Sequence, residues 1–213
     1  MPAFADRTKR PPRTPTDSEV KRLLAVTGKA KDGFRDHMIL SLTLGCGLRE
    51  SEIVALNIGD VTKDPKRRKP VRVIELRVFK RAGLDARPED HRVHVPDATY
   101  YKLEKYLKTG LTRDGFAPSQ MYPDTQLFWS KKGNRLSTKA VRTMCRTWQK
   151  RAGFDHFYNF HSLRHYAITA VRRRTKDIRI AQRFARHVNI ATTIRYEHAS
   201  DEELAAAVKG MVA

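Results

Sequence analysis

The chain has 213 residues, with 43 Lys and Arg against 23 Asp and Glu, so its formal net charge is +20. Hydrophobic residues make up 40% of it, which is enough for a buried core and argues against a wholly disordered chain. No apolar run approaches the roughly 18 residues that a membrane-spanning helix needs, and two cysteines cannot form a disulfide framework or a four-ligand zinc site by themselves.

The excess of positive charge indicates a polyanionic partner. Lys and Arg are spread along the chain rather than confined to a tail, which suits a folded surface that faces phosphates. Nucleic acid is favoured over a membrane, because no basic amphipathic segment with exposed Trp, Phe or Leu stands out. A ribosomal or other nonspecific basic protein is the alternative at this point. The few cysteines and the lack of a signal-peptide pattern predict a cytoplasmic location.

The first predicted element follows a basic, proline-rich start. Residues 1–15 cannot bury a core, and we expect a basic extended arm or the remnant of a linker there. Thr16 and Glu19 have the spacing of a capping box ahead of a helical apolar pattern. A single folded domain is therefore predicted over residues 16–213.

Two more helices are predicted before the apolar pattern changes. They cover about 34–44 and 49–56, because Gly45 and Gly47 interrupt the pattern between them and residues 57–60 end it.

The middle of the chain has the composition of a small hairpin. Short runs of β-branched residues at 71–78 and 93–95 flank the polar segment 81–90, which predicts two antiparallel strands. Helical periodicity returns at Asp97. The apolar face of that helix is formed by Tyr100, Leu103, Tyr106 and Leu107.

The remainder is predicted to be helical after a long loop at 111–126 and a short apolar element at 127–129. The predicted helices cover about 137–152, 162–174, 178–185 and 190–196, and a second capping box opens a last amphipathic helix at Ser200. The fold class expected is α+β, mostly helical with one small antiparallel sheet.

Three segments carry residues suited to phosphate chemistry. In the first, Arg49 follows a glycine-bounded turn at a predicted helix N-terminus, where backbone N–H groups already favour an anion. Glu52 lies one turn on and can brace Arg49 by an i,i+3 pair. Taken alone, this segment fits equally well an exposed Arg–Glu pair that contributes little to stability and has no role in binding phosphate.

The second segment places two phosphate-binding side chains on one helix face. His161 and Arg164 are three residues apart, so an imidazole and a guanidinium can grip the same phosphate. The third segment contains His187 and Tyr196. A tyrosine can serve as a covalent nucleophile, but its phenol needs a base or a cationic environment, because its pKa is ordinarily near 10. Each segment alone also fits an ordinary helix surface.

Together and in this order, the three segments resemble the tyrosine recombinases, also called the phage integrase family. The matching pieces are Gly47-Leu48-Arg49-x-Ser51-Glu52, His161-x-Leu163-Arg164-His165, and His187 followed by Thr192-Thr193 and Tyr196. The resemblance runs from about Thr14 to the C-terminus. One departure is Ala185-Arg186, where the family usually has Leu-Gly before the histidine of the third segment.

The resemblance implies a mechanism. Arg49 and Arg164 would bind the scissile phosphate and stabilise its pentacoordinate transition state, and His161 and His187 would hydrogen-bond it. Tyr196 would attack phosphorus and form a 3′-phosphotyrosine while the 5′-oxygen leaves.

The remaining implied roles concern protons and support. His161 would accept the proton of Tyr196. Lys80 on the hairpin, with Arg81 adjacent and Lys69 nearby, would protonate the leaving 5′-oxygen, and Glu52 would brace the first arginine.

The resemblance and the charge together imply a set of partners. Double-stranded DNA with specific recombination sites is expected, bound by a monomer that joins other protomers on DNA, with a tetramer in synapsis. The residues expected to bind DNA are Arg49, Lys66, Arg67, Arg68, Lys69, Lys80, Arg81 and Arg164. No nucleotide or other cofactor is expected, because exchanging a phosphodiester for a phosphotyrosine ester keeps the bond energy. No metal is expected, because cationic side chains supply the positive charge that a metal ion would otherwise bring to the phosphate. Action at the nucleoid is expected.

The predicted function is therefore a site-specific DNA recombinase or integrase. Type IB topoisomerase-like relaxation of DNA and a DNA-binding regulator that no longer cleaves are the alternatives. The family's N-terminal core-binding domain is expected to be absent from residues 1–213, as in a catalytic-domain-only recombinase or a fragment of a longer integrase.

Overall fold

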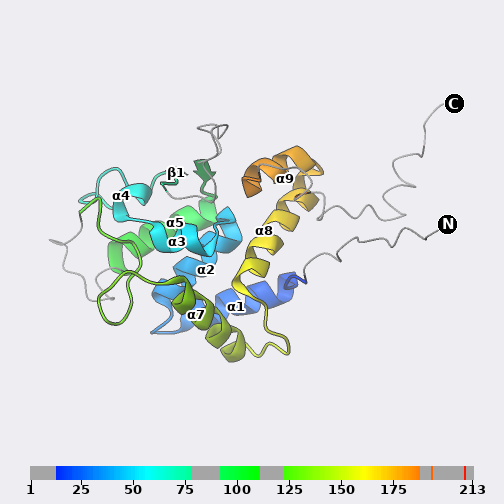
Figure 1. Ribbon diagram of the computed structural model, residues 1–213, viewed down its shortest axis with the longest axis horizontal. Coiled ribbons are helices and arrows are strands. Elements are labelled where there is room, and N and C mark those ends of the chain that lie inside the picture. The colour runs from blue at the N-terminus through cyan, green and yellow to red at the C-terminus, as the bar shows by residue number, and fades with distance from the viewer. Residues whose placement is uncertain (1–12, 78–91, 111–121, 188–192, 194–208, 210–213) are drawn as a thin grey trace, which may run out of the picture.

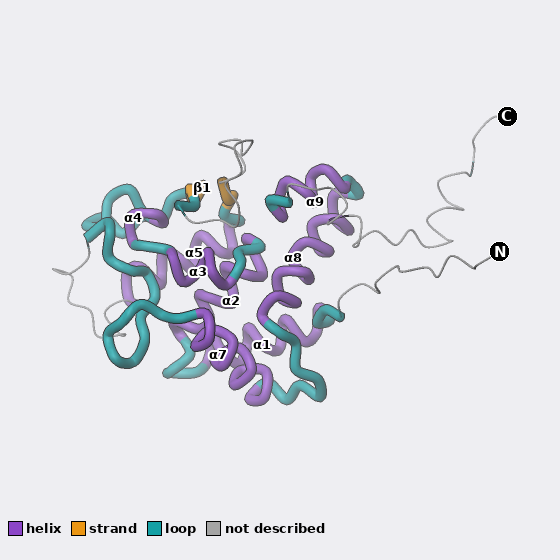
Figure 2. The backbone as a smooth tube through the Cα atoms, in the orientation of Figure 1, coloured by secondary structure: helices purple, strands orange, loops and turns teal. Residues whose placement is uncertain are grey.

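The computed structural model describes residues 13–77, 92–110, 122–187, 193 and 209. Its elements, in chain order, are α1 (Asp17–Lys29), α2 (Phe34–Cys46), α3 (Glu50–Ala55), α4 (Ile58–Val61), β1 (Val73–Glu75), β2 (Arg92–His94), α5 (Asp97–Lys105), the π-helical turn η2 (Tyr106–Gly110), α7 (Thr138–Arg151), α8 (Phe160–Thr175) and α9 (Ile178–Ala185) (Figure 1). The α+β prediction is confirmed, since helices dominate the described residues and two short strands lie at one edge (Figure 2).

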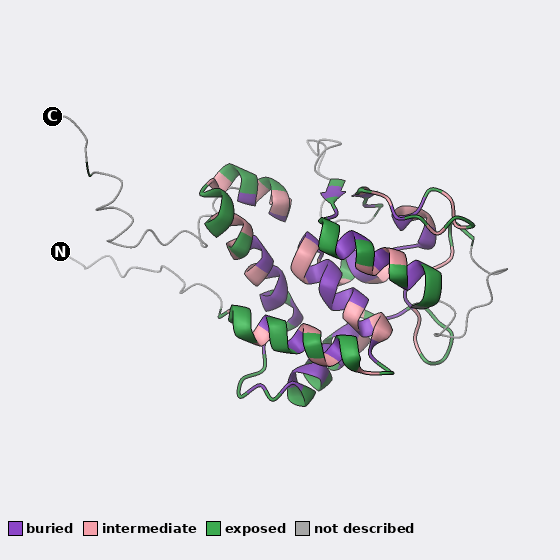
Figure 3. Ribbon diagram, turned by 180° about the vertical axis from the view of Figure 1, so that it is seen from behind, coloured by how far each residue is buried: buried purple, intermediate pink, exposed green. Residues whose placement is uncertain are grey.

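The core is organised around α2. This helix is apolar on most of its surface, with every residue from Met38 to Leu42 buried, so it can be covered from several sides. It packs against α1, α5 and α8. Buried residues gather at the centre of the molecule while exposed residues cover the outer helix faces (Figure 3).

The predicted helix starts at residues 16 and 137 are confirmed, and the structure shows a capping side chain at each. The Thr16 side chain accepts a hydrogen bond from the Glu19 N–H, and the Glu19 carboxylate accepts one from the Thr16 N–H at 2.7 Å. Ser137 caps α7 in the same way as Thr16 caps α1, through its side chain. The helix expected at 178–185 is observed as Ile178–Ala185.

Three helix predictions were wrong in detail. The helix expected to end at residue 44 continues through Gly45 to Cys46, and only Gly47 ends it. Residues 57–60 do not simply end α3, because Ile58 and Gly59 donate backbone hydrogen bonds to the Thr125 and Pro123 carbonyls while Ile58–Val61 forms the short helix α4. The helix expected from residue 162 begins at Phe160, because the Asn159 side chain caps it.

The hairpin is smaller than predicted. β1 and β2 pair antiparallel with Ile74 opposite Val93, and both of these side chains are buried. Val71 lies before β1, where its N–H donates to the Val61 carbonyl instead of a strand partner. The expected strand residue Val78 lies outside the described residues.

The apolar face predicted for α5 is confirmed, since Tyr100, Leu103, Tyr106 and Leu107 are all buried. α8 and α9 lie to one side of the α2 bundle and share a second small core. Apart from Thr193 and Lys209, the predicted helices at 190–196 and from Ser200 lie outside the described residues, as do residues 111–121 of the predicted loop and the first 12 residues. None of the described helices is long and apolar enough to cross a membrane.

Candidate functional site

The site begins at the turn after α2. Gly47 has a left-handed backbone with φ of +63°, which ends α2 and favours glycine. A Cβ added there would stand 2.8 Å from the Phe184 ring, so the turn also needs a small residue to let α9 approach. The chain then enters α3 at Arg49, beside the end of α9.

Arg49 and Glu52 form the pair predicted from their spacing. Arg49 Nη1 lies 2.5 Å from Glu52 Oε1, and the Arg49 N–H donates to Glu52 Oε2 at 2.8 Å. The Glu52 side chain is 0% exposed and that of Arg49 is 19% exposed, so the surface-pair reading was wrong. The Glu52 carboxylate also takes the N–H of Arg49, which is the N-cap residue of α3.

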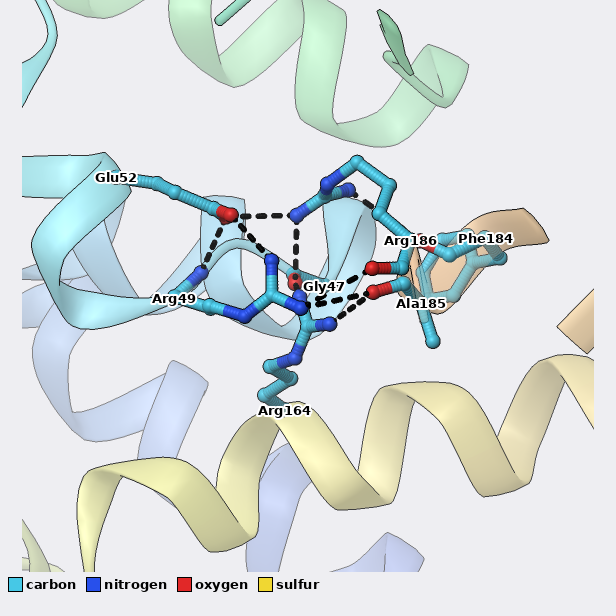
Figure 4. A network of polar contacts seen from close by, with 7 residues as sticks. All are labelled: Gly47, Arg49, Glu52, Arg164, Phe184, Ala185 and Arg186. Atoms are coloured by element: carbon cyan, nitrogen blue, oxygen red, sulfur yellow. Dashed lines mark hydrogen bonds and ion pairs between the residues drawn. The ribbon is translucent and has the colours of Figure 1, made fainter. Parts of the chain in front are cut away.

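Arg164 reaches the same place from α8. It is 1% exposed, and its two Nη groups donate to the backbone carbonyls of Gly47 and Ala185 (Figure 4). Arg49 Nη2 also donates to the Ala185 carbonyl, at 3.4 Å. The Ala185 oxygen therefore holds both predicted phosphate-binding arginines near one another.

A third guanidinium enters from the end of α9. Arg186 Nη2 lies 2.7 Å from Glu52 Oε2, and the Arg186 side chain is 4% exposed. Three cations thus surround one carboxylate. Burial alone would raise the pKa of Glu52, but Arg186, Arg49 and Arg164 outweigh it and hold the pKa below its ordinary value.

The predicted histidines lie around this cluster. His187 follows Arg186 directly, and its Nδ1 lies 3.1 Å from Thr193 Oγ1. Burial, then Arg164 and Arg49, lower the pKa of His187 to about 3, so its imidazole is neutral at pH 7. His161 is exposed at the start of α8, and its ring packs edge-on against His165 at 4.2 Å between centroids.

His165 and Arg186 are the site residues to which sequence analysis assigned no role. Burial, then His161 and Arg164, lower the pKa of His165 to about 4, so His165 interacts electrostatically with residues of the same site. His165 follows the second arginine directly, and Arg186 occupies the position where the family usually has glycine. These two sequence positions are the features from which a role for His165 and Arg186 could have been predicted.

Other predicted residues lie away from the cluster or outside the described residues. Lys80, Arg81 and Tyr196 belong to the second group. Lys66, Arg67 and Lys69 are exposed in the turn before β1, whereas Arg68 is partly buried and donates to the Lys108 carbonyl at 3.0 Å. Arg67 and Lys69 line a cavity of about 800 Å³ with Lys63, Arg72 and Arg77 among its other cations.

Two tyrosines near α1 are poor candidates for a nucleophile. The Tyr158 hydroxyl donates to Glu19, and the Tyr166 hydroxyl donates to Asp17 at 2.8 Å. Burial, followed by these hydrogen bonds, raises the pKa of Tyr158 and raises that of Tyr166 to about 12. Among the residues that the structure describes, no group of three or more His, Cys, Asp or Glu side chains could hold a metal ion.

Comparison with known proteins gives one family. The model of the phage integrase family matches residues 14–203. The chain is 32% identical to the tyrosine recombinase XerC of Haemophilus influenzae (strain PittEE) over 196 residues, which cover 91% of this chain and 59% of that protein. It is 29% identical to the tyrosine recombinase XerA of Pyrococcus horikoshii over 205 residues, covering 93% of this chain and 61% of that protein. The chain thus spans about three fifths of the length of these relatives.

Solved structures agree in fold. A crystal structure of XerA recombinase superposes with a TM-score of 0.70 at 27% identity, covering 94% of this chain and 65% of that one. The Tn1549 transposon integrase (aa 82–397), solved with circular intermediate DNA, gives a TM-score of 0.72 at 18% identity, covering 94% and 67% of the two chains. The second likeness concerns the fold alone.

Proposed function

The chain belongs to the phage integrase family, and from this premise we propose that it is a site-specific DNA recombinase or integrase. It cleaves and rejoins DNA strands through a 3′-phosphotyrosine intermediate. The observation that carries the proposal is the convergence of Arg49, Arg164 and His187, from three separate segments, on one buried carboxylate and one turn. Guanidinium groups gathered in this way suit a phosphate whose charge grows in a transition state.

The two arginines take the scissile phosphate in this proposal. Arg164 keeps N–H groups that no acceptor uses, and its Nε is buried without a hydrogen-bond partner among the described residues. A buried donor of this kind is costly unless an acceptor arrives, and a phosphate oxygen is such an acceptor. Arg49 is the more exposed of the two, and it donates to the same Ala185 carbonyl as Arg164.

The chemical step we propose exchanges one ester for another. The bond between Tyr196 Oη and phosphorus forms while the bond between phosphorus and the 5′-oxygen breaks. His161 takes the tyrosine proton, Lys80 supplies a proton to the 5′-oxygen, and His187 hydrogen-bonds the phosphate. A neutral His187, as its low pKa in the free chain implies, can donate one hydrogen bond without repelling the neighbouring arginines.

The substrate we propose is double-stranded DNA carrying specific recombination sites. A net charge of +20 favours binding to phosphates along the duplex. The cavity before β1 carries further cations that could contact phosphates, beside the carboxylates of Asp60, Asp64 and Glu75. The protein is proposed to act in the cytoplasm, at the nucleoid.

The active assembly is proposed to contain several protomers, monomeric when free and tetrameric in synapsis. Residues 200–213 have the pattern of a short amphipathic helix, which is too short to be stable alone and must dock on something. Docking on a neighbouring protomer would order Tyr196 only in the DNA-bound assembly. Deleting residues 204–213 should then impair joining of two sites more than binding of one, and a truncated protein that recombines at the full rate would contradict docking in trans.

Relaxation of DNA and a purely regulatory role are the weaker alternatives. The relatives XerC and XerA described above are named tyrosine recombinases, which favours recombination. The cationic cluster favours a cleaving enzyme over a regulator, since a regulator has no use for two buried arginines and one partly buried arginine around one carboxylate.

The proposed function can be tested without knowing the DNA site. Host genomic DNA is nicked lightly with DNase I and incubated with the protein, and covalent adducts that survive detergent are captured and sequenced. A nick beside a cleaved bond lets the short strand leave and traps the enzyme. We expect adducts enriched at one sequence, and none with Tyr196→Phe. Adducts spread evenly over the genome would favour relaxation, and a wild-type protein that forms no adduct would contradict the proposed function.

A further inference from the structure

Arg186 occupies a backbone position that disfavours it. Its φ is +52°, in the left-handed region at the C-cap of α9, where glycine is the common residue. The family's usual glycine at this position fits that geometry. A side chain held in such a conformation calls for a compensating contact elsewhere.

The contacts of Arg186 all point inward. Nη2 bonds Glu52 Oε2 at 2.7 Å and the Gly47 carbonyl at 3.4 Å, and Nη1 bonds the Phe184 carbonyl at 3.3 Å. Its Nε is buried without a partner among the described residues. A guanidinium that is 4% exposed and already committed to protein acceptors is poorly placed to meet DNA directly.

The backbone of the same turn holds the two arginines assigned to the phosphate. The Ala185 carbonyl accepts from Arg164 and Arg49, and the Arg186 carbonyl accepts from Arg49 Nη2 at 3.3 Å. Anything that fixes this turn therefore fixes Arg49 and Arg164 (Figure 4).

We propose that Arg186 is a positioning residue that ties the turn at 185–187 to Glu52 and so sets the orientation of Arg49 and Arg164 for the phosphate. This inference rests on the proposed function. By taking one oxygen of Glu52, Arg186 limits Arg49 Nη1 to the other oxygen and weakens the hold of the carboxylate on Arg49. It also leaves the cluster with two net positive charges, from three guanidinium groups and one carboxylate, where glycine would leave one.

The surroundings of Glu52 supply a second signature of this role. The charged groups that face it are Arg186 from the end of α9, Arg49 from α3 and Arg164 from α8. The Cys46 thiol lies near Arg186, but burial raises the pKa of this thiol to about 12, so it adds no charge. Without Arg186, the pKa of Glu52 should rise. Protonation of the Glu52 carboxylate should then break its ion pair with Arg49 at a higher pH than in the wild type.

The test compares three substitutions at this position with a matched control. Arg186→Gly removes the side chain and relieves the backbone, so it keeps the test open if Arg186→Met folds poorly. Arg186→Lys keeps the charge without the fork. Arg183→Met changes an exposed arginine of the same helix. Adduct formation is measured in single turnover at saturating nicked DNA, over a range of pH and salt.

We expect Arg186→Gly and Arg186→Met to slow adduct formation about tenfold or more, by comparison with losses of 10²-fold or more when a transition-state donor itself is removed. Arg186→Lys should recover part of the rate, and Arg183→Met should match the wild type. In the glycine variant the acid limb of the rate should move to higher pH. The dependence of log affinity on log salt should be unchanged.

Two results would overturn the inference. One is an Arg186→Gly variant with the wild-type rate and acid limb. The other is a fall of about one in the salt slope, which would mean a lost phosphate contact and make Arg186 a DNA-binding residue. Failure of the wild-type protein to form any adduct would instead count against the proposed function.

Discussion

Glutamine at position 52 should destabilise the protein far more than glutamine at position 50 of the same helix. The Glu52 carboxylate is 0% exposed and pairs with Arg49 and Arg186. Glu50 is 25% exposed and pairs with Arg142, which is 63% exposed. Removing one partner of a buried ion pair costs roughly 3–5 kcal/mol because uncompensated charge stays behind, whereas an exposed pair contributes about 0–1 kcal/mol.

These magnitudes convert to separable melting temperatures. In a domain of this size each kcal/mol shifts the Tm by about 2–4 °C. Glu52→Gln should therefore lower the Tm by on the order of 10 °C, and Glu50→Gln by no more than about 4 °C. Thermal unfolding followed by circular dichroism, with urea unfolding as a second measure, gives both values.

The pH dependence of the difference provides an internal check. The pKa of Glu52 lies below its ordinary value, so its contribution to stability is present above about pH 4.3 and is lost as the pH falls through the folded-state pKa. The gap between wild type and Glu52→Gln should thus shrink in acid. Combining Glu52→Gln with Arg186→Met should cost less than the sum of the two changes, because the second removes a cation that the first left unpaired. Equal losses from Glu52→Gln and Glu50→Gln would refute the reasoning.

Three further predictions concern the site and the buried histidines. Arg49→Ala should lower the single-turnover cleavage rate by on the order of 10²-fold or more with little loss of DNA affinity. Lys66→Ala should instead lower the salt slope of DNA binding by about one and leave the cleavage rate at saturating DNA unchanged. Equal losses of cleavage rate in the two variants would contradict the separation of a catalytic arginine from a DNA-binding lysine. Cleavage should continue in EDTA because cationic side chains supply the charge, and a strict Mg²⁺ requirement for that step would contradict it. Burial is the largest cause that lowers the pKa values of His37, His165 and His187, to about 4, about 4 and about 3. The unfolded chain therefore takes up protons near pH 6.5 that the folded chain does not, so the free energy of unfolding measured in urea should fall from pH 7 to 5, and it should fall less in His37→Gln. A free energy of unfolding that stays constant over this range would contradict these pKa shifts.

Elements with local signals could be predicted from the sequence. Thr16 and Ser137 mark helix starts because a side-chain cap depends only on residues within one turn. The pairing of Arg49 with Glu52 follows from i,i+3 spacing in the same way.

Features that depend on distant contacts could not be predicted. The shortness of β1 depends on Val71 pairing with Val61, and α4 depends on carbonyls at 123 and 125. The burial of Glu52 required α9 to bring Arg186 across 134 residues of chain. Sequence spacing alone therefore could not decide whether the Arg49–Glu52 pair is exposed or buried. Tertiary packing buries Glu52 and brings the other arginines to it.

The central claim is that Tyr196 carries the DNA in a covalent intermediate, and mass spectrometry of the trapped adduct tests it most directly. After nuclease trimming and trypsin digestion, the account predicts nucleotide mass on the peptide 196–209, and no such peptide from Tyr196→Phe. Tyr158→Phe should leave the adduct intact, because the Tyr158 hydroxyl is held by Glu19 and its pKa is raised by burial and by that hydrogen bond. Nucleotide mass on the peptide 152–164, or an adduct that persists in Tyr196→Phe, would contradict the account.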